Sequence, residues 1–124
     1  FPSILEMSGM GVPENLALRG RSFVPLLKGE SIPWDNTLFG QYDMHHGAVA
    51  RLRMIRTPEW KLIRHYEPEV PDELYHLADD PEENRNLAHS EGTREVFDDL
   101  NSRLTLWMGR IGDPLISERV KSGQ

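Results

Sequence analysis

The sequence predicts an α+β fold, in which a small antiparallel β-sheet of three to four strands packs against one long C-terminal amphipathic helix. Between residues 37 and 77, short strand-like runs are separated by turns that contain Pro or Gly, as in antiparallel sheets. Between residues 93 and 108, apolar side chains instead recur at helical spacing. A short helical remnant at the N-terminus completes the predicted fold.

The N-terminal residues 1–9 read as the end of a helix, with Ile4, Leu5 and Ser8 as its inner stripe. The chain starts with Phe1 rather than Met, and the helical pattern is entered part-way. We therefore expect further residues to precede Phe1.

A second short helix is expected to begin at Ser22, whose hydroxyl can cap it, and to end after Leu27 at Lys28-Gly29. The flanking segments 10–21 and 29–36 are rich in Gly, Pro and Asn, which is typical of loops. The strands are expected to follow at residues 37–43, 51–57, 60–66 and 74–77.

The second and third predicted strands form an antiparallel hairpin, because Pro58 cannot lie inside a central strand and must occupy the turn. Strict alternation places Leu52 and Met54 on one face of the second strand, and Arg53 and Ile55 on the other.

The last strong element is a helix from residue 93 to about residue 108, ended by Gly109 or Gly112 and by Pro114. Its charged residues fall mainly on the opposite side from one apolar stripe. One sheet and one helix make a thin core, so a second apolar surface that meets a larger domain is expected. The stripe consists of Val96, Phe97, Leu100, Leu104, Trp107, Met108 and Ile111.

The bulk composition narrows the possible functions. The 124 residues carry a net charge of −6, whereas a general nucleic-acid binder is usually basic. No run of residues is long and apolar enough to span a membrane. The chain has no cysteine, which excludes disulfides, Cys-based zinc sites and thiol nucleophiles within it.

Two adjacent histidines, His45 and His46, are the first candidate binding residues. Adjacent side chains of a regular strand point to opposite faces, so both could bind one ion only in a loop. Asp43 could orient His45 or share a metal with it. A polar loop at a strand end is the simpler interpretation, and a ligand-contacting loop and a metal site remain alternatives.

An arginine cluster is the second candidate, because the planar guanidinium suits sulfate, phosphate or carboxylate. Pairing with nearby acidic residues on the sheet surface is the favoured alternative. The arginines are Arg51, Arg53, Arg56 and Arg64, and the acidic candidates are Glu59, Glu67, Glu69 and Asp72.

The acidic turn at residues 79–83 is the third candidate, since clustered carboxylates can bind calcium. It lacks the Gly and terminal Glu of an EF-hand loop, so capping and solvation explain it better. No phosphate-binding loop, GxSxG or HExxH motif is present.

Three segments, taken together and in order, resemble the C-terminal region of the sulfatase family, in particular N-sulfoglucosamine sulfohydrolase-like and arylsulfatase-like enzymes of the alkaline-phosphatase superfamily. FPSILEMSG followed by LRGRSFVPLLKG is similar to a helix leading to the family's Gly-Arg-Ser-Leu-x-Pro-Leu-Leu-x-Gly segment. RMIRTPEWKLI resembles its hairpin, and ELYHLADDPEENRNLA resembles its Glu-Leu-Tyr-Asp-Leu segment, except that His76 stands where Asp is common. The resemblance covers roughly residues 1–109.

The resemblance implies that residues 1–36 are the end of a catalytic-domain region and a linker, that residues 37–112 are a C-terminal sulfatase subdomain, and that residues 113–124 are a polar tail. Calcium and a formylglycine nucleophile are expected in the catalytic domain, outside this chain. No catalytic or metal residue can be carried over, and no cofactor is expected within the chain itself. A periplasmic or extracellular location is suggested by the resemblance alone.

The partner implied by the resemblance is therefore an N-terminal catalytic domain, with a sulfated glycan as a candidate ligand at the rim of its substrate cleft. We expect His45, His46 and Arg51 to contact that substrate, and an exposed apolar face to favour self-association of the isolated chain. The alternatives are the C-terminal piece of a phosphonate monoester or phosphodiester hydrolase of the same superfamily, and a non-catalytic interaction module.

Overall fold

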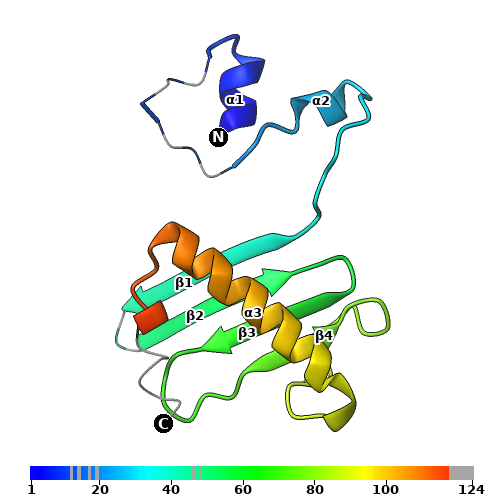
Figure 1. Cartoon of the computed structure of the whole chain (residues 1–124), viewed down its shortest axis with the longest axis vertical. Helices are drawn as coiled ribbons and strands as arrows, with labels where there is room; N and C mark the ends of the chain where they lie inside the picture. The colour runs from blue at the N-terminus through cyan, green and yellow to red at the C-terminus, as the bar shows by residue number, and fades with distance from the viewer. Residues whose placement is uncertain are drawn as a thin grey trace. The chain divides into compact units, whose positions relative to one another are not determined.

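A computed structural model of the chain describes residues 1–11, 13, 15, 16, 18, 20–45, 47 and 49–117 (Figure 1). The chain divides into two compact units, residues 1–35 and residues 36–124. The first unit holds two short helices, and the second holds the sheet and the long helix.

The N-terminal unit contains α1 (Pro2–Met7) and α2 (Val24–Leu27). Helix α1 buries Ser3 and Leu5, and the hydroxyl of Ser3 accepts a hydrogen bond from the backbone N–H of Phe23. The predicted inner stripe of α1 is therefore wrong at Ile4, which is 60% exposed, and at Ser8.

Large apolar side chains are exposed throughout this first unit, so it has too few residues to bury its own hydrophobic surface. The exposed apolar residues are Phe1, Ile4, Met7, Met10, Leu16, Phe23, Leu26 and Leu27.

The second unit is built on a four-stranded antiparallel sheet in the order β1-β2-β3-β4, which confirms the predicted fold class. Its strands are β1 (Leu38–His45), β2 (Val49–Arg56), β3 (Trp60–His65) and β4 (Glu73–His76). Consecutive strands pair with their neighbours, so the sheet is a simple meander.

The β2–β3 hairpin turns at Thr57 and Pro58, as the sequence predicts. The Thr57 backbone N–H donates to the Trp60 carbonyl at 2.8 Å, and the Trp60 N–H donates to the Thr57 hydroxyl at 3.0 Å. These two bonds close the turn and fix the register of the central strands.

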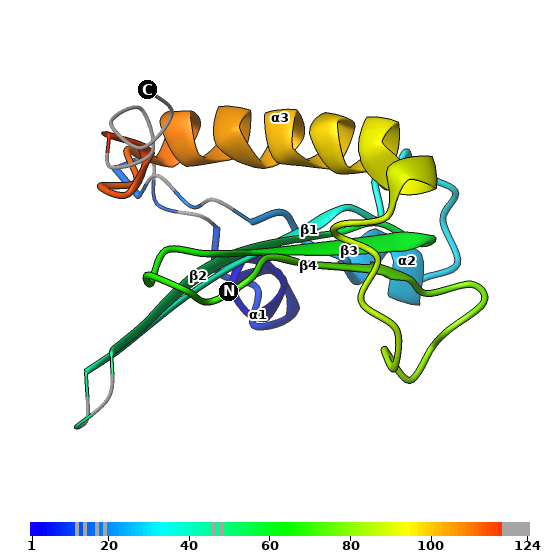
Figure 2. The same cartoon turned by 90° about the horizontal axis from the view of Figure 1, so that it is seen from below.

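Helix α3 (Arg94–Ile111) follows a short 3-10 turn (Glu91–Thr93) and covers one face of the sheet (Figure 2). It ends at Gly112, which adopts the left-handed conformation with φ of 66°. The Asp113 N–H then donates to the Met108 carbonyl, so the chain turns back after the helix.

The core lies between α3 and the inner face of the sheet, which is the face that α3 covers. The rings of Phe39 and Trp107 stack there with centroids 5.0 Å apart. Each fully buried aliphatic side chain contributes about 1.5–3 kcal/mol relative to an exposed one. The buried cluster comprises Ile55, Leu62, Leu74, Leu100, Leu104, Met108 and Leu115.

Leu115 extends this core beyond the helix, into the segment that the sequence analysis assigned to a polar tail. Both Asp113 and Leu115 are buried, and their burial was not anticipated.

Candidate functional site

The β1–β2 hairpin carries His45 and Arg51, two of the three candidate binding residues that the sequence singles out. His45 is the last residue of β1 and pairs through its backbone with Val49, and Arg51 pairs with Asp43. His46 and the side chain of His45 lie outside what the structure describes. His45 and Arg51 are thus brought onto one hairpin, and the prediction that they bind substrate stays a prediction.

Arg51 already has a carboxylate partner. Its Nε donates to Glu67 Oε1 at 2.7 Å, and its Nη2 donates to the Tyr66 carbonyl at 3.3 Å. The Arg51 side chain keeps 26% of its area exposed. An anionic ligand would reach this guanidinium, but it would compete with Glu67.

Arg53 is the most buried charged residue of the described chain and lies on the inner face of the sheet beside Ile55. Its Nε donates to Asp113 Oδ2 at 2.6 Å, and its Nη1 donates to Asp43 Oδ1 at 2.8 Å. Burial opposes the charged form of Arg53, but the bonds to Asp113 and Asp43 outweigh it, so the pKa of Arg53 is raised.

Asp113 is held as a carboxylate by the same contacts. Burial alone would raise the pKa of Asp113, but the Arg53 hydrogen bonds and the Leu115 N–H, which donates to Oδ1 at 3.0 Å, lower it overall. The sequence pattern alone did not predict this pair. The signal available was that Arg53 shares a face with Ile55, and a charge in a core needs a partner.

Arg64 is also paired. Its Nε lies 2.9 Å from Asp72 Oδ2 as an ion pair without hydrogen-bond geometry, and its Nη1 donates to Asn101 Oδ1 of α3. Its guanidinium lies 5.0 Å from the centroid of the Phe97 ring. Three of the four arginines, Arg51, Arg53 and Arg64, thus pair with carboxylates. Arg51 and Arg64 pair with Glu67 and Asp72, which were expected partners. Arg53 pairs instead with Asp43 and Asp113, which were not expected.

On the outer face of the sheet, turned away from α3, His65, Glu73 and Tyr75 form a chain of hydrogen bonds that the sequence analysis did not identify. The His65 Nε2 lies 2.7 Å from Glu73 Oε1, and the Tyr75 hydroxyl donates to Glu73 Oε2 at 2.5 Å. The hydrogen bond to Glu73, aided by burial, raises the pKa of Tyr75 to about 12. Burial would raise the pKa of Glu73, but bonds from Tyr75 and His65 lower it overall.

The acidic turn serves as a cap, as the sequence analysis favoured. The Asp80 carboxylate accepts the backbone N–H of Asn84 at 3.1 Å and that of Arg85 at 2.8 Å. These bonds lower the pKa of Asp80. Across the described ranges, no group of three or more His, Asp or Glu side chains is arranged to hold a metal ion.

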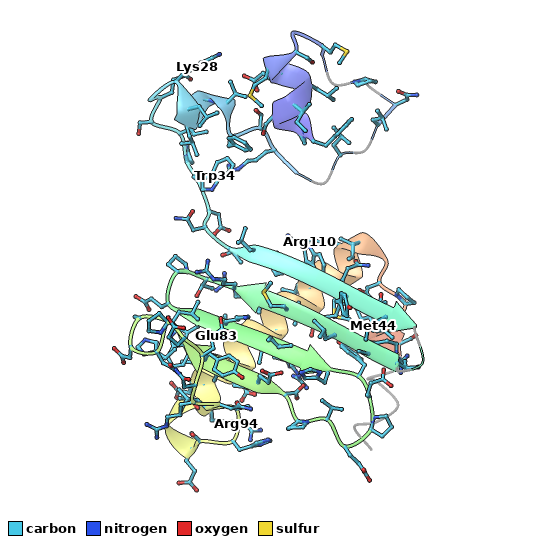
Figure 3. All side chains as sticks on the ribbon, turned by 180° about the vertical axis from the view of Figure 1, so that it is seen from behind. Lys28, Trp34, Met44, Glu83, Arg94 and Arg110 are labelled. Carbon is cyan, nitrogen blue, oxygen red and sulfur yellow. The ribbon has the colours of Figure 1, made fainter. Side chains whose placement is uncertain are left out.

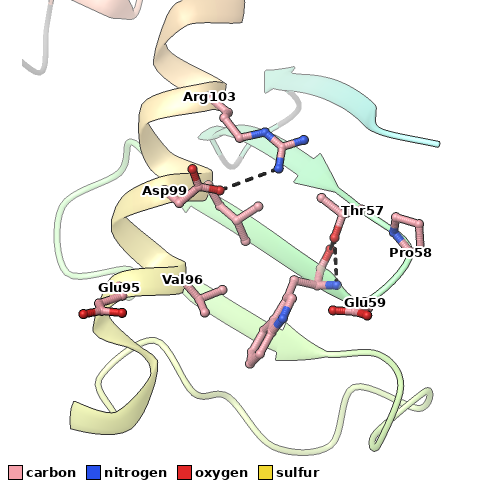
Figure 4. Close-up of a pocket in the computed structure, with 9 residues that line it drawn as sticks. Thr57, Pro58, Glu59, Glu95, Val96, Asp99 and Arg103 are labelled. Atoms are coloured by element: carbon pink, nitrogen blue, oxygen red, sulfur yellow. Dashed lines mark hydrogen bonds and ion pairs between the residues drawn. The ribbon is translucent and has the colours of Figure 1, made fainter. Parts of the chain in front are cut away.

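A pocket of about 520 Å³ lies between the β2–β3 turn and α3 (Figure 4). Trp60, Val96 and Leu100 provide its apolar lining, and Asp99 and Arg103 lie on α3 with their charged atoms 3.6 Å apart. Its one hydroxyl, on Thr57, is bonded within the turn. This lining can hold an apolar group, and its other charged groups are the carboxylates of Glu59 and Glu95.

Within the described part of the chain, no helix combines the length and the apolar character that crossing a membrane would require.

Comparison with known proteins identifies the family. The family model described as "N-sulphoglucosamine sulphohydrolase, C-terminal" matches residues 1–108. An ulvan-active sulfatase from Formosa agariphila is 27% identical over 97% of this chain and 30% of its own length. Arylsulfatase K from Danio rerio is 35% identical over 71% of this chain and 17% of its own length.

Solved structures agree with these matches. A 2-O GAG sulfatase superposes with a TM-score of 0.81 at 25% identity, over 94% of this chain and 25% of that one. The phosphonate monoester hydrolase of Agrobacterium radiobacter gives 0.72 at 26% identity, over 89% of this chain and 24% of that one. The chain spans less than a third of the length of these relatives. From the family match and these likenesses, we conclude that the chain belongs to the C-terminal domain family of N-sulphoglucosamine sulphohydrolase and other sulfatases.

Proposed function

We propose that the chain acts as the C-terminal domain of a longer sulfatase, in which it packs on a catalytic domain and edges the substrate cleft without performing the chemistry itself. The family match over residues 1–108 carries this proposal. The small share of each relative that the chain spans supports it, because most of each relative's length lies outside the matched region.

The parent reaction would be hydrolysis of a sulfate ester or sulfamate. A formylglycine nucleophile and a calcium ion, both in the catalytic domain, would supply the attack on sulfur and the charge compensation. In the part of the chain described here, the charged side chains at the sheet mainly hold one another in place, as with Arg53 and Asp113.

Residues 1–36 would belong to the catalytic-domain region and linker, residues 37–112 to the C-terminal subdomain and residues 113–124 to a tail. The large apolar side chains exposed in the first unit support the first assignment, because a surrounding catalytic domain would cover them. This assignment predicts that residues 1–35 are unprotected from proteases in the isolated chain and protected in the longer protein.

The tip of the β1–β2 hairpin would form the substrate rim, with His45, His46 and Arg51 facing a sulfated glycan. Arg51 supports this proposal because it is partly exposed and held in place by Glu67. In binding, a sulfate would take the place of the Glu67 carboxylate, which has the same charge sign and also accepts bonds from a guanidinium.

The rim is tested in the longer polypeptide with His45→Ala, His46→Ala and Arg51→Ala. Each substitution should raise KM for a sulfated oligosaccharide by roughly tenfold or more, the size of one lost charge-assisted bond, and leave KM for a small aryl sulfate unchanged. Arg94→Ala is the matched control, since Arg94 is an exposed arginine on α3 paired only to Asp98 in the described contacts. Unchanged KM values for all three variants would contradict the proposal that these residues contact the substrate.

The likeness to a phosphonate monoester hydrolase supports a second candidate parent of the same superfamily. The two parents are separated by assaying the longer polypeptide on an aryl sulfate and an aryl phosphonate monoester. A higher kcat/KM for the sulfate supports the sulfatase, and a higher value for the phosphonate supports the alternative.

A further inference from the structure

The pocket between the β2–β3 turn and α3, which we call the turn–helix pocket, lies apart from the candidate substrate rim. Its lining begins at Thr57, directly after β2 ends, whereas the rim adjoins the start of β2 at Val49. Figure 3 shows the same separation: Met44, near the β1–β2 turn, and Arg94, the first residue of α3, lie at opposite ends of the sheet. The volume of about 520 Å³ also suits a ligand, since small-molecule sites usually measure about 300–1,000 Å³.

The apolar lining of the turn–helix pocket includes the indole ring of Trp60. This ring is held in place, because its centroid lies 4.3 Å from that of the His76 imidazole, whose Nδ1 lies 2.7 Å from Asp79 Oδ2. Val96 and the buried Leu100 supply the aliphatic part of the lining from α3. Such a lining can cover the apolar stem of a ligand, and the face of an indole ring also attracts a cation.

The charged groups of the turn–helix pocket are mostly carboxylates. Its one guanidinium, on Arg103, is shared between Asp99, 3.6 Å away, and the Thr37 hydroxyl, to which Nη2 donates at 2.9 Å. In the part of the chain that the structure describes, neither the Glu59 nor the Glu95 side chain has a basic partner. Figure 4 shows these two glutamates on opposite sides of the pocket, Glu59 in the turn and Glu95 on α3. The pocket therefore carries uncompensated negative charge on both sides of its apolar lining.

The backbone of the β2–β3 turn already uses its carbonyl groups. The Trp60 carbonyl accepts the Thr57 N–H at 2.8 Å and the Thr57 hydroxyl at 3.2 Å, and the Glu59 carbonyl accepts the Leu77 N–H at 2.7 Å. An extended peptide depends on main-chain hydrogen bonds for much of its affinity, so it would gain little from this turn. A small ligand with one positive charge and an apolar stem needs only the carboxylates and the apolar lining.

We propose that the turn–helix pocket binds a small organic amine, whose ammonium group is attracted by the Glu59 and Glu95 carboxylates and whose apolar stem lies against Trp60. Charge complementarity carries the inference, because the same carboxylates repel an anion and Arg103 is already engaged by Asp99. The net charge of −6 on the chain adds to the attraction. The inference does not depend on the proposed function, since the pocket contains none of the residues assigned to the substrate rim.

Nuclear magnetic resonance titration of the 124-residue chain tests the proposal with three matched probes: 2-phenylethylammonium, the uncharged 2-phenylethanol and the anion phenylacetate. Binding is read from the Trp60 indole N–H and from the amides of the β2–β3 turn and the start of α3. The ammonium should bind roughly fivefold or more tightly than the alcohol, the effect of one exposed ion pair, and the anion should bind most weakly. Equal affinities of the ammonium and the alcohol, tighter binding of the anion, or the absence of a saturable shift would each overturn the proposal.

Substitutions locate the charge that attracts the amine. Glu59→Gln and Glu95→Gln should each weaken binding of 2-phenylethylammonium by roughly twofold to fivefold and leave binding of 2-phenylethanol unchanged. Glu91→Gln is the matched control, because Glu91 is an exposed glutamate of the 3-10 turn before α3 and does not line the pocket. All three variants remove one negative charge from an exposed side chain. An equal loss of affinity in the control, which would indicate general attraction to an acidic chain, or no loss in either pocket variant would overturn the proposal.

Discussion

Arg53 and Asp113 form a buried, two-point ion pair across 60 residues of sequence, with Nε–Oδ2 at 2.6 Å and Nη2–Oδ1 at 3.2 Å. Arg53 lies on β2 and Asp113 follows α3, so the pair ties the end of the helix to the sheet. Both side chains are 1% exposed, and the Leu115 N–H completes the bonding of the carboxylate.

Removing one partner of this pair should be costly, because it leaves the other charge buried. Asp113→Ala should lower the free energy of unfolding by about 3–5 kcal/mol. Asp43→Ala is the matched comparison: its carboxylate is 36% exposed, and its loss should cost about 1 kcal/mol or less. Urea unfolding followed by tryptophan fluorescence measures both values, and equal losses would contradict the assigned roles.

The same carboxylate predicts acid sensitivity. The folded-state pKa of Asp113 lies below its ordinary value of 3.8. A lowered folded pKa stabilises the fold above the unfolded pKa, and this contribution is lost as the pH falls below about 4 and through the folded pKa. Asp113→Asn should therefore unfold at a urea midpoint that varies less with pH between about 4 and 2 than that of the parent chain. An unchanged pH dependence would show that other carboxylates control acid unfolding.

Tyr75 should make the fold less stable as the pH becomes alkaline. The hydrogen bond to Glu73, with burial, raises the pKa of Tyr75 from 10.0 to about 12 in the folded state. A raised pKa gives stability that is complete below the unfolded value near 10 and is lost as the pH rises toward 12. Tyr75→Phe should flatten the fall in urea midpoint between pH 10 and 12. If the variant and the parent fall in parallel, the Tyr75–Glu73 bond does not contribute as described.

Gly112 should be sensitive to a side chain for backbone reasons alone. Its φ of 66° is left-handed, and no atom lies within 4 Å of an added Cβ. Gly112→Ala should destabilise the fold by about 1–2 kcal/mol, the cost of a left-handed non-glycine residue. Gly109→Ala is the matched control inside α3, where Ile116 Cδ1 lies 3.5 Å from the added Cβ and alanine favours the helix by up to about 1 kcal/mol. Equal thermal shifts in the two variants would contradict this account of the helix end.

Local patterns predicted the framework of the fold. Alternation at Arg53 and Ile55 gave the correct shared face, Pro58 marked the β2–β3 turn, and the periodic stripe gave α3. These elements depend on residues that are close together in the sequence, so side-chain periodicity and turn residues are enough to predict them.

Non-local contacts were not predictable in the same way. Asp113 follows a Gly and precedes a Pro, so it reads as an exposed turn residue, and only its distant partner Arg53 explains its burial. The His65–Glu73–Tyr75 chain likewise depends on the register of β3 and β4. The buried face of α1 was also predicted incorrectly. Ile4 was expected on that face, but Ser3 and Leu5 are buried instead.

The central claim, that the chain is a sulfatase domain that depends on a catalytic partner, is tested most directly by measuring sulfate release. The measurement compares the isolated 124-residue chain with the longer polypeptide on one sulfate monoester. We expect the longer polypeptide to release sulfate and the isolated chain to release none. Sulfate release by the isolated chain, or none by the longer polypeptide when it cleaves a phosphonate monoester instead, would contradict it.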